Sequence, residues 1–156
     1  MKSNYQIIIE YDGTNYSGWQ FQKNGPSIQK EIEIALKKLL KNNVKVTGSG
    51  RTDSGVHAVG QSANFICNKL EDEKKFLNSL NYFLSKKNIT IKSLKKKKIN
   101  FNSRFDAKKR IYKYIIVNRR SSLVLDKNRA WLVKKKFKEF KNFFSSPNFL
   151  HIKFAD

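Results

Sequence analysis

The stretch Gly48–Gln61, "GSGRTDSGVHAVGQ", places an arginine, an aspartate and a histidine among four of the chain's seven glycines. Glycine tolerates positive φ angles and close backbone approach, so an aspartate in such a turn can be reached by a bound molecule. Arg51 precedes Asp53 by two residues, and in an extended chain such side chains point the same way. An arginine there would keep the carboxylate ionised and could also hold a phosphate.

An ionised carboxylate in a glycine-rich turn can do chemistry, because it can attack a carbon, accept a proton and later leave. The structural alternative is an aspartate that only hydrogen-bonds the backbone of its own turn. The other acidic candidates are expected to have structural roles, Asp12 in a turn and Asp106 as a cap or as a partner of nearby cations. For His57, a hydrogen bond at the start of a strand is favoured over a role as general base.

The charge of the chain indicates a polyanionic partner. Its 156 residues include 33 basic and 12 acidic residues, which gives a net charge of +21, and such a chain favours RNA or DNA. Only six of the basic residues are arginines. These are the more informative ones, because arginine reads phosphates and stacks on bases. We interpret the lysine runs Lys95–Lys98 and Lys134–Lys136 as solvated faces.

Other features disfavour metal, disulfide and membrane proteins. With Cys67 as the single cysteine and with two histidines, the chain can form neither an internal disulfide nor a zinc cluster. The N-terminus lacks the features of a signal peptide, and no apolar run approaches the roughly 20 residues that a bilayer requires. We therefore expect a cytoplasmic protein.

The hydrophobic pattern predicts alternating strands and helices. Strands are expected over residues 5–13, 44–50, 56–67, 88–96 and 110–118, and helices over 27–41, with Ser27 as N-cap, and 71–85. The inward residues are expected to be Ile28, Ile32, Ala35, Leu36 and Leu39 on the first helix, and Phe76, Leu77, Leu80, Phe83 and Leu84 on the second. The order β-α-β-β-α-β with extra strands predicts an α/β (α+β) fold, a ferredoxin-like sandwich with a mostly antiparallel sheet and helices on one face.

Three motifs together identify a family. The stretches Tyr11–Gln22, Gly50–Gln61 and Arg104–Asn118 read "YDGTNYSGWQFQ", "GRTDSGVHAVGQ" and "RFDAKKRIYKYIIVN". In this order and spacing they resemble the tRNA pseudouridine synthases of the TruA family. The resemblance covers about residues 4 to 120. It implies an N-terminal subdomain with the catalytic aspartate over 1–120 and the start of a truncated C-terminal subdomain over 121–156.

The resemblance implies an RNA isomerase. Such enzymes convert uridine to pseudouridine in the anticodon stem-loop of tRNA, breaking the N1–C1′ bond and rejoining the uracil through C5, without a metal or cofactor. The family's catalytic aspartate matches Asp53, the nucleophile. The tyrosine of its R-x-Y-x-Y motif matches Tyr112, which would pack on the target base. Arg51 would bind substrate beside Asp53.

The resemblance also bears on partners. We expect Gln20, Arg104, Lys108 and Arg110 to contact tRNA, and Trp19 to pack in the core. Full-length members of the family are expected to be homodimers and to carry a second, similar half. The motifs of that half are absent here, so we expect a truncated form that binds tRNA weakly and forms little pseudouridine alone.

Two non-enzymatic hypotheses remain. In a basic RNA-binding module of the RRM type, tyrosines of the strand at 110–118 would be stacking platforms. Such a module does not need the turn at Asp53, however, and the strand lacks the glycine-aromatic signature of the class. A basic structural protein would account for the charge but not for Asp53 among glycines.

Overall fold

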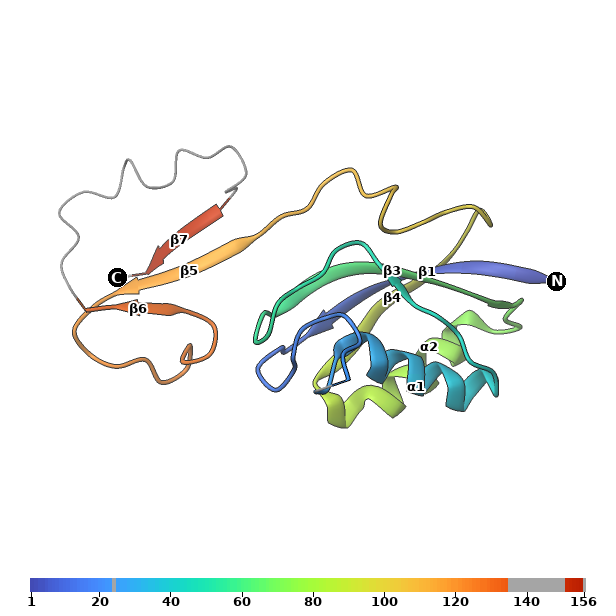
Figure 1. Cartoon of the computed structure of the whole chain (residues 1–156), viewed down its shortest axis with the longest axis horizontal. Helices are drawn as coiled ribbons and strands as arrows, with labels where there is room; N and C mark the ends of the chain where they lie inside the picture. Colours follow the sequence, from blue (N-terminus) through green and yellow to red (C-terminus); the bar gives the residue numbers. More distant parts are fainter. Residues whose placement is uncertain (24, 135–150, 156) are drawn as a thin grey trace. The chain divides into compact units, whose positions relative to one another are not determined.

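The computed structural model of the chain describes residues 1–23, 25–134 and 151–155. The chain divides into two compact units, Met1–Lys108 and Lys109–Asp156. The first unit holds two helices and a four-stranded sheet, and the second holds a three-stranded sheet (Figure 1). The subdomain boundary at residue 120 stays a prediction, because it refers to the organisation of the longer family members.

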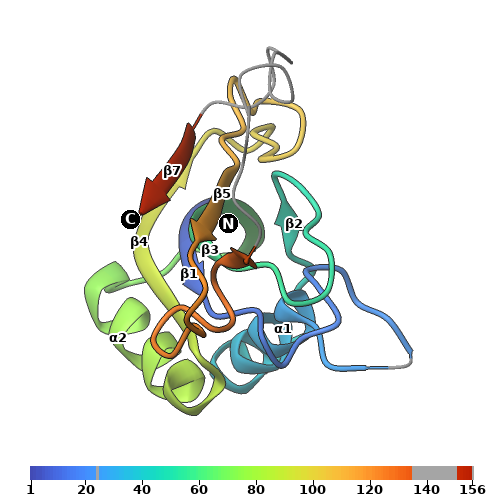
Figure 2. The same cartoon turned by 90° about the vertical axis from the view of Figure 1, so that its left-hand side faces the viewer.

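An antiparallel sheet with two helices on one face forms the first unit (Figures 1 and 2). Its elements, in chain order, are β1 (Lys2–Tyr11), α1 (Ile28–Leu40), β2 (Thr47–Gly48), β3 (Ala58–Asn68), α2 (Glu73–Leu84), the short 3-10 helix η1 (Ser85–Lys87) and β4 (Ile89–Lys97). The strands lie in the order β2-β3-β1-β4, and each neighbouring pair is antiparallel. The expected mixed α/β sandwich with an antiparallel sheet is thereby confirmed.

Strand alternation separates the two faces of this sheet. Tyr5, Ile7 and Ile9 of β1 are fully buried in the same apolar core as Phe65 of β3, beneath the helices. Their neighbours along the strands point to the opposite face, because successive side chains of a strand alternate. That face carries no helix, and we call it the helix-free face.

Both helices begin and pack largely as predicted. Ser27 caps α1, and its hydroxyl accepts a hydrogen bond from the Lys30 N–H at 3.4 Å. The five inward residues predicted for α1 all lie in the core or pack against it. On α2 the prediction for Phe83 is wrong. Leu80 and Leu84 take the central positions, while Phe83 is 38% exposed at the rim, where the Lys38 ammonium lies 5.5 Å from its ring centroid.

The strand predicted at 44–50 is reduced to β2, because side chains of α1 bind the preceding backbone. The Val46 N–H donates to the Glu33 carboxylate at 2.9 Å, and the Gln29 amide donates to the Val46 carbonyl at 3.0 Å. These bonds replace the ladder bonds that a longer strand would form.

The second unit is a parallel sheet with strand order β6-β5-β7, made of β5 (Lys113–Asn118), β6 (Trp131–Val133) and β7 (His151–Ala155). The strand predicted at 110–118 is therefore present but belongs to a sheet of its own. It begins at Lys113, so Tyr112 lies just before it. Among the helices of the described residues, none is long and apolar enough to cross a membrane.

Candidate active site

Asp53 lies in the loop between β2 and β3, which we call the Asp53 loop (residues 49–57). Its side chain is exposed, but both of its neighbours are fixed by the loop that follows β1. The Trp19 N–H donates to the Thr52 carbonyl at 3.0 Å, and the Ser54 hydroxyl donates to the Tyr16 carbonyl at 3.1 Å. The carboxylate is thus presented to solvent from a backbone held on both sides.

Tyr11 ties the loop to the sheet. Its hydroxyl donates to Gln61 Oε1 at 2.6 Å and lies 2.8 Å from Thr52 Oγ1, which can donate to it in turn. The Gln61 amide then donates to the Gly50 carbonyl at 2.8 Å. Burial raises the pKa of the Tyr11 phenol, so the tyrosine stays neutral and keeps its donor.

The first motif (Tyr11–Gln22) also packs against the second motif (Gly50–Gln61). Trp19 is 3% exposed, as predicted for a core residue, and its ring centroid lies 6.2 Å from that of Tyr11. Gly18 has φ +109°, and a Cβ there would lie 2.4 Å from the Thr52 carbonyl oxygen. Only glycine combines this backbone angle with this approach, so the two motifs interlock directly beside Asp53.

Tyr16 anchors the loop after β1 to the segment that precedes β4. Its carbonyl accepts from Ser54, and its hydroxyl donates to the Lys87 carbonyl at 2.6 Å. Burial, with a smaller contribution from the negative charge of Glu31, raises the pKa of Tyr16 to about 12. Ionisation of this phenol would therefore oppose folding.

The competing titratable residues have the structural roles predicted for them. Asp12 Oδ1 accepts from the Thr14 N–H at 2.9 Å, and Asp106 Oδ2 accepts from the Asn102 N–H at 2.8 Å. His57 Nδ1 lies 3.2 Å from both the Gly13 N–H and Asp12 Oδ1. His57 thus joins the start of β3 to the turn at Asp12 and Gly13.

By contrast, the Asp53 carboxylate makes no hydrogen bond or ion pair within the described residues. The exposed Arg51 does not pair with it in this structure, so the role of Arg51 stays a prediction. Nor does any group of three His, Cys, Asp or Glu side chains that could hold a metal occur in residues 1–23, 25–134 and 151–155.

The predicted RNA contacts divide between the two units. Gln20, Arg104 and Lys108 are exposed in the first unit, whereas Arg110 and Tyr112 are exposed in the second. Tyr112 and Asp53 belong to different units, so their juxtaposition stays a prediction.

One exposed aromatic residue was missed by the sequence reasoning. Phe105 is 79% exposed, and the centre of the Arg104 guanidinium lies 5.9 Å from its ring centroid. The Arg-Phe pair inside the third motif was the available signal.

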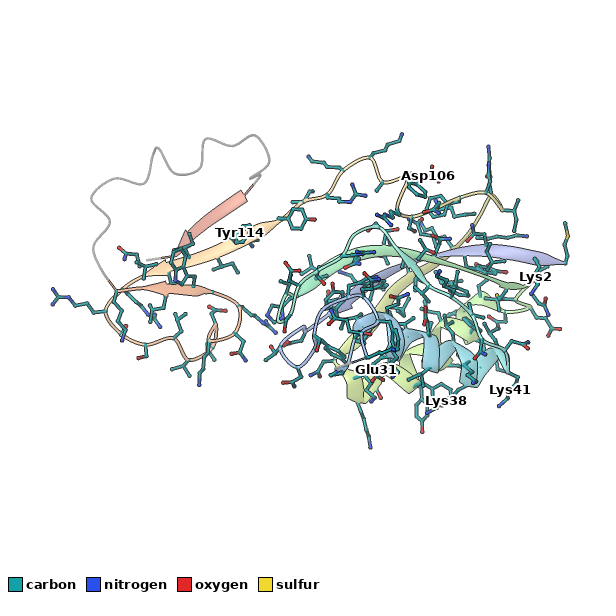
Figure 3. The ribbon with its side chains drawn as sticks, in the orientation of Figure 1. Lys2, Glu31, Lys38, Lys41, Asp106 and Tyr114 are labelled. Carbon is teal, nitrogen blue, oxygen red and sulfur yellow. The ribbon has the colours of Figure 1, made fainter. Side chains whose placement is uncertain are left out.

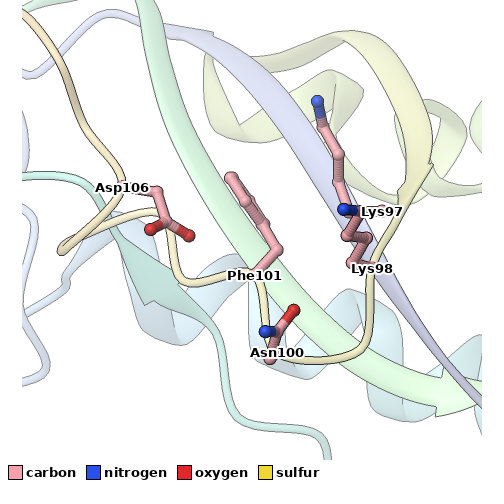
Figure 4. Close-up of a pocket in the computed structure, with 5 residues that line it drawn as sticks. All are labelled: Lys97, Lys98, Asn100, Phe101 and Asp106. Carbon is pink, nitrogen blue, oxygen red and sulfur yellow. The ribbon is translucent and has the colours of Figure 1, made fainter.

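A pocket of about 360 Å³ lies beside the segment that precedes this pair. Lys97, Lys98, Asn100, Phe101 and Asp106 line it (Figure 4). None of these residues belongs to the Asp53 loop, so this pocket is separate from the carboxylate.

Comparison with known proteins matches the region that carries this geometry. A family model described as tRNA pseudouridine synthase matches residues 7–106. A tRNA pseudouridine synthase A of Pelagibacter ubique is 52% identical over 133 residues, which are 85% of this chain and 54% of the relative. One from Ehrlichia ruminantium (strain Gardel) is 48% identical over 130 residues, 83% of this chain and 53% of the relative. The chain thus spans about half the length of the curated relatives it matches, and it belongs to the tRNA pseudouridine synthase family.

Proposed function

We propose that the protein isomerises uridine to pseudouridine in tRNA, with Asp53 as the nucleophile. The observation that carries this proposal is the exposed, unpaired carboxylate of Asp53 on a loop whose neighbouring residues are fixed by Trp19 and Tyr16. A nucleophile must reach the substrate without losing its orientation, and an anchored loop meets both demands.

The reaction needs only bond exchange within the nucleotide. The N1–C1′ bond breaks, the uracil turns, and a C5–C1′ bond forms, while C5 loses a proton and N1 gains one. Asp53 attacks a carbon of the sugar or of the base and leaves again when the new bond has formed. Because the product is an isomer of the substrate, the balance requires no oxidant, reductant or energy source.

The substrate-binding roles complete the proposal. Tyr112 provides the aromatic surface for the uracil that has left its stack, a contact worth roughly 1–3 kcal/mol per base. Arg51 binds substrate beside the nucleophile. Gln20, Arg104, Lys108 and Arg110 contact the tRNA, most of them through phosphates. The proposed target is the anticodon stem-loop.

Because the chain spans about half the length of its relatives, its activity is best assayed together with the half that it lacks. We propose that the 1–120 region supplies the aspartate and that the remaining half of the relatives closes the site. Water exclusion and electrostatic positioning then depend on both halves. The complete protein is proposed to act in the cytoplasm as a homodimer.

The test is to join this chain to the C-terminal half of the Pelagibacter ubique relative and to map pseudouridine in tRNA. The fusion is expected to modify tRNA, the Asp53→Asn fusion to bind tRNA with unchanged affinity but without turnover, and the Glu10→Gln fusion to retain activity. Glu10 is a control because it is an exposed acidic side chain of the same unit, and its ion pair with Lys92 at 3.2 Å lies outside the Asp53 loop. Substantial turnover by the Asp53→Asn fusion would remove Asp53 from its proposed role.

A further inference from the structure

The segment of residues 101–106, which we call the Phe105 turn, is irregular, yet each of its backbone N–H groups is hydrogen-bonded. All six of its backbone N–H groups have an acceptor: Lys98 O for Phe101, Asp106 Oδ2 for Asn102, Asn64 Oδ1 for Ser103, Asn102 Oδ1 for Arg104 and Phe105, and Asn102 O for Asp106. The donor–acceptor distances run from 2.8 to 3.4 Å. A loop that satisfies every backbone N–H in one arrangement is conformationally defined.

A buried pair of amides fixes this turn to the sheet. Asn4 of β1 is fully buried, and its Nδ2 donates to the Phe101 carbonyl at 2.7 Å. Asn64 of β3 donates to Asn4 Oδ1 at 3.1 Å and accepts from the Ser103 N–H at 2.8 Å. Polar groups removed from water in this way are costly unless all are paired. Here every buried side-chain N and O atom of the described residues has a partner.

The amide pair also determines on which side of the sheet the turn lies. Asn4 and Asn64 alternate along their strands with the core residues Tyr5 and Phe65, so they point to the helix-free face. Figure 3 shows Asp106, at the end of the turn, on the side of the sheet away from Glu31 of α1. The turn therefore lies on the helix-free face of the first unit.

What this turn holds in solvent is an aromatic ring next to a cation. Phe105 is 79% exposed with the Arg104 guanidinium 5.9 Å from its ring centroid, and the following residues are "DAKKR". Single-stranded nucleic acid is bound by this combination, since bases stack on aromatic rings while cations contact the backbone. Charge complementarity with a chain of net charge +21 favours RNA over an apolar protein surface as the occupant.

We propose that Phe105 is a stacking platform for an unpaired base of the RNA and that Arg104 contacts the adjacent phosphate. The inference rests on the proposed function in that it takes RNA as the ligand. Because the turn is already ordered, RNA binding loses little conformational entropy there. Most of the free energy of stacking therefore contributes to affinity.

The test measures affinity of the 156-residue chain for a fluorescein-labelled anticodon stem-loop RNA by anisotropy. Phe105→Ala is expected to lose at least about fivefold in affinity, the lower end of measured base–aromatic stacking. Phe105→Trp should stay within about twofold of the parent chain, and Phe105→Leu should lose as much as Phe105→Ala. Tyr82→Ala is the matched control, because Tyr82 is an aromatic residue of α2 with 77% exposure on the opposite side of the sheet.

The outcomes separate the alternatives. If Phe105→Ala binds as well as Tyr82→Ala does, the inference is overturned while the proposed function stands. If Phe105→Leu binds as well as Phe105→Trp, the ring serves apolar packing, for example against a second copy of the chain, and stacking is refuted. If the parent chain shows no affinity for the RNA, RNA binding by this part of the proposed enzyme fails, and the stacking role fails with it.

A second set of variants tests the positioning by the amide pair. Asn64→Ala is expected to accelerate hydrogen exchange at the Ser103 amide and to weaken RNA binding as much as Phe105→Ala does, and the double variant should lose no more than either. Asn81→Ala is the control, since Asn81 makes an equivalent pair of bonds to the Ile91 backbone at 3.0 and 2.7 Å. Unchanged exchange at Ser103 in Asn64→Ala, or additive losses in the double variant, would refute the positioning role.

Discussion

Replacing Gly18 by alanine should dislodge the backbone beside Asp53, and Gly55 offers a matched comparison. Both glycines have positive φ, +109° at Gly18 and +77° at Gly55. A Cβ at Gly18 would lie 2.4 Å from the Thr52 carbonyl oxygen, whereas a Cβ at Gly55 would have no atom within 4 Å. Both substitutions therefore carry a penalty for positive φ, and only the one at Gly18 adds a steric conflict.

The magnitudes follow from this difference. Positive φ costs an alanine roughly 1–2 kcal/mol, and the smaller entropy of its unfolded chain returns roughly 0.4–1 kcal/mol. Gly55→Ala should thus lower the free energy of unfolding by about 1 kcal/mol. Gly18→Ala adds the displacement of a hydrogen-bonded carbonyl, and forcing atoms into a packed site costs roughly 1–3 kcal/mol. Its total is expected to be about 3 kcal/mol.

Urea unfolding, followed by the fluorescence of the buried Trp19 in a Trp131→Phe background, reports on the first unit. With a slope of about 2 kcal/mol/M, the midpoint of Gly18→Ala should lie about 1 M below that of Gly55→Ala. In the fusion that modifies tRNA, Gly18→Ala should also reduce turnover more than Gly55→Ala. Coincident midpoints would mean that the Thr52 carbonyl moves freely and that the interlock does not position Asp53.

Three further predictions use the same chain. Asp53→Asn should change the free energy of unfolding by less than about 0.5 kcal/mol in urea titrations, because its exposed side chain has no partner to lose among the described residues; a larger loss would assign it a structural role. Arg104→Ala and Arg110→Ala should each flatten the slope of log affinity against log salt by about one phosphate contact in RNA titrations, whereas serine at Lys95–Lys98 should matter less; equal effects would contradict the emphasis on arginine. Stability should fall as the pH rises from 10 to about 12, because the raised pKa of Tyr16 makes the folded state hold a proton that the unfolded state releases. Thermal melts should show Tyr16→Phe losing the part of this dependence that comes from Tyr16, and an unchanged pH profile would refute it.

The elements of the first unit were predictable because their signals are local. The apolar alternation of β1, the Ser27 cap and the 3.6-residue spacing of α1 each act within a few residues. The separation of β5 into another sheet was not predictable in this way, because the partner of a strand depends on contacts distant in sequence. Phe83 was misassigned for a related reason: it lies beside Leu84, and helical spacing alone does not decide which of the two takes the central position.

The residues of the candidate site were found by motif, but their supports were not. Asp53 stands out by its glycine-rich surroundings, whereas the bonds from Trp19 and Tyr16 that hold its loop join segments more than 30 residues apart. The buried pair Asn4 and Asn64 was missed, because asparagine on a strand indicates a solvated face in the sequence. Only the fold shows that the Phe105 turn covers this pair of asparagines and removes it from solvent.

The position of β4 suggests a second role for the lysine run Lys95–Lys98. In the order β2-β3-β1-β4 this strand is at the edge of its sheet, and an edge strand presents unpaired backbone groups to which another chain could add. Lys95 and Lys96 of this run are exposed along it. Two such edges brought together would face each other with like charges, which opposes intermolecular strand pairing. The lysines would then protect the chain against aggregation, and replacing them by neutral residues would lower its solubility even where RNA binding is unaffected.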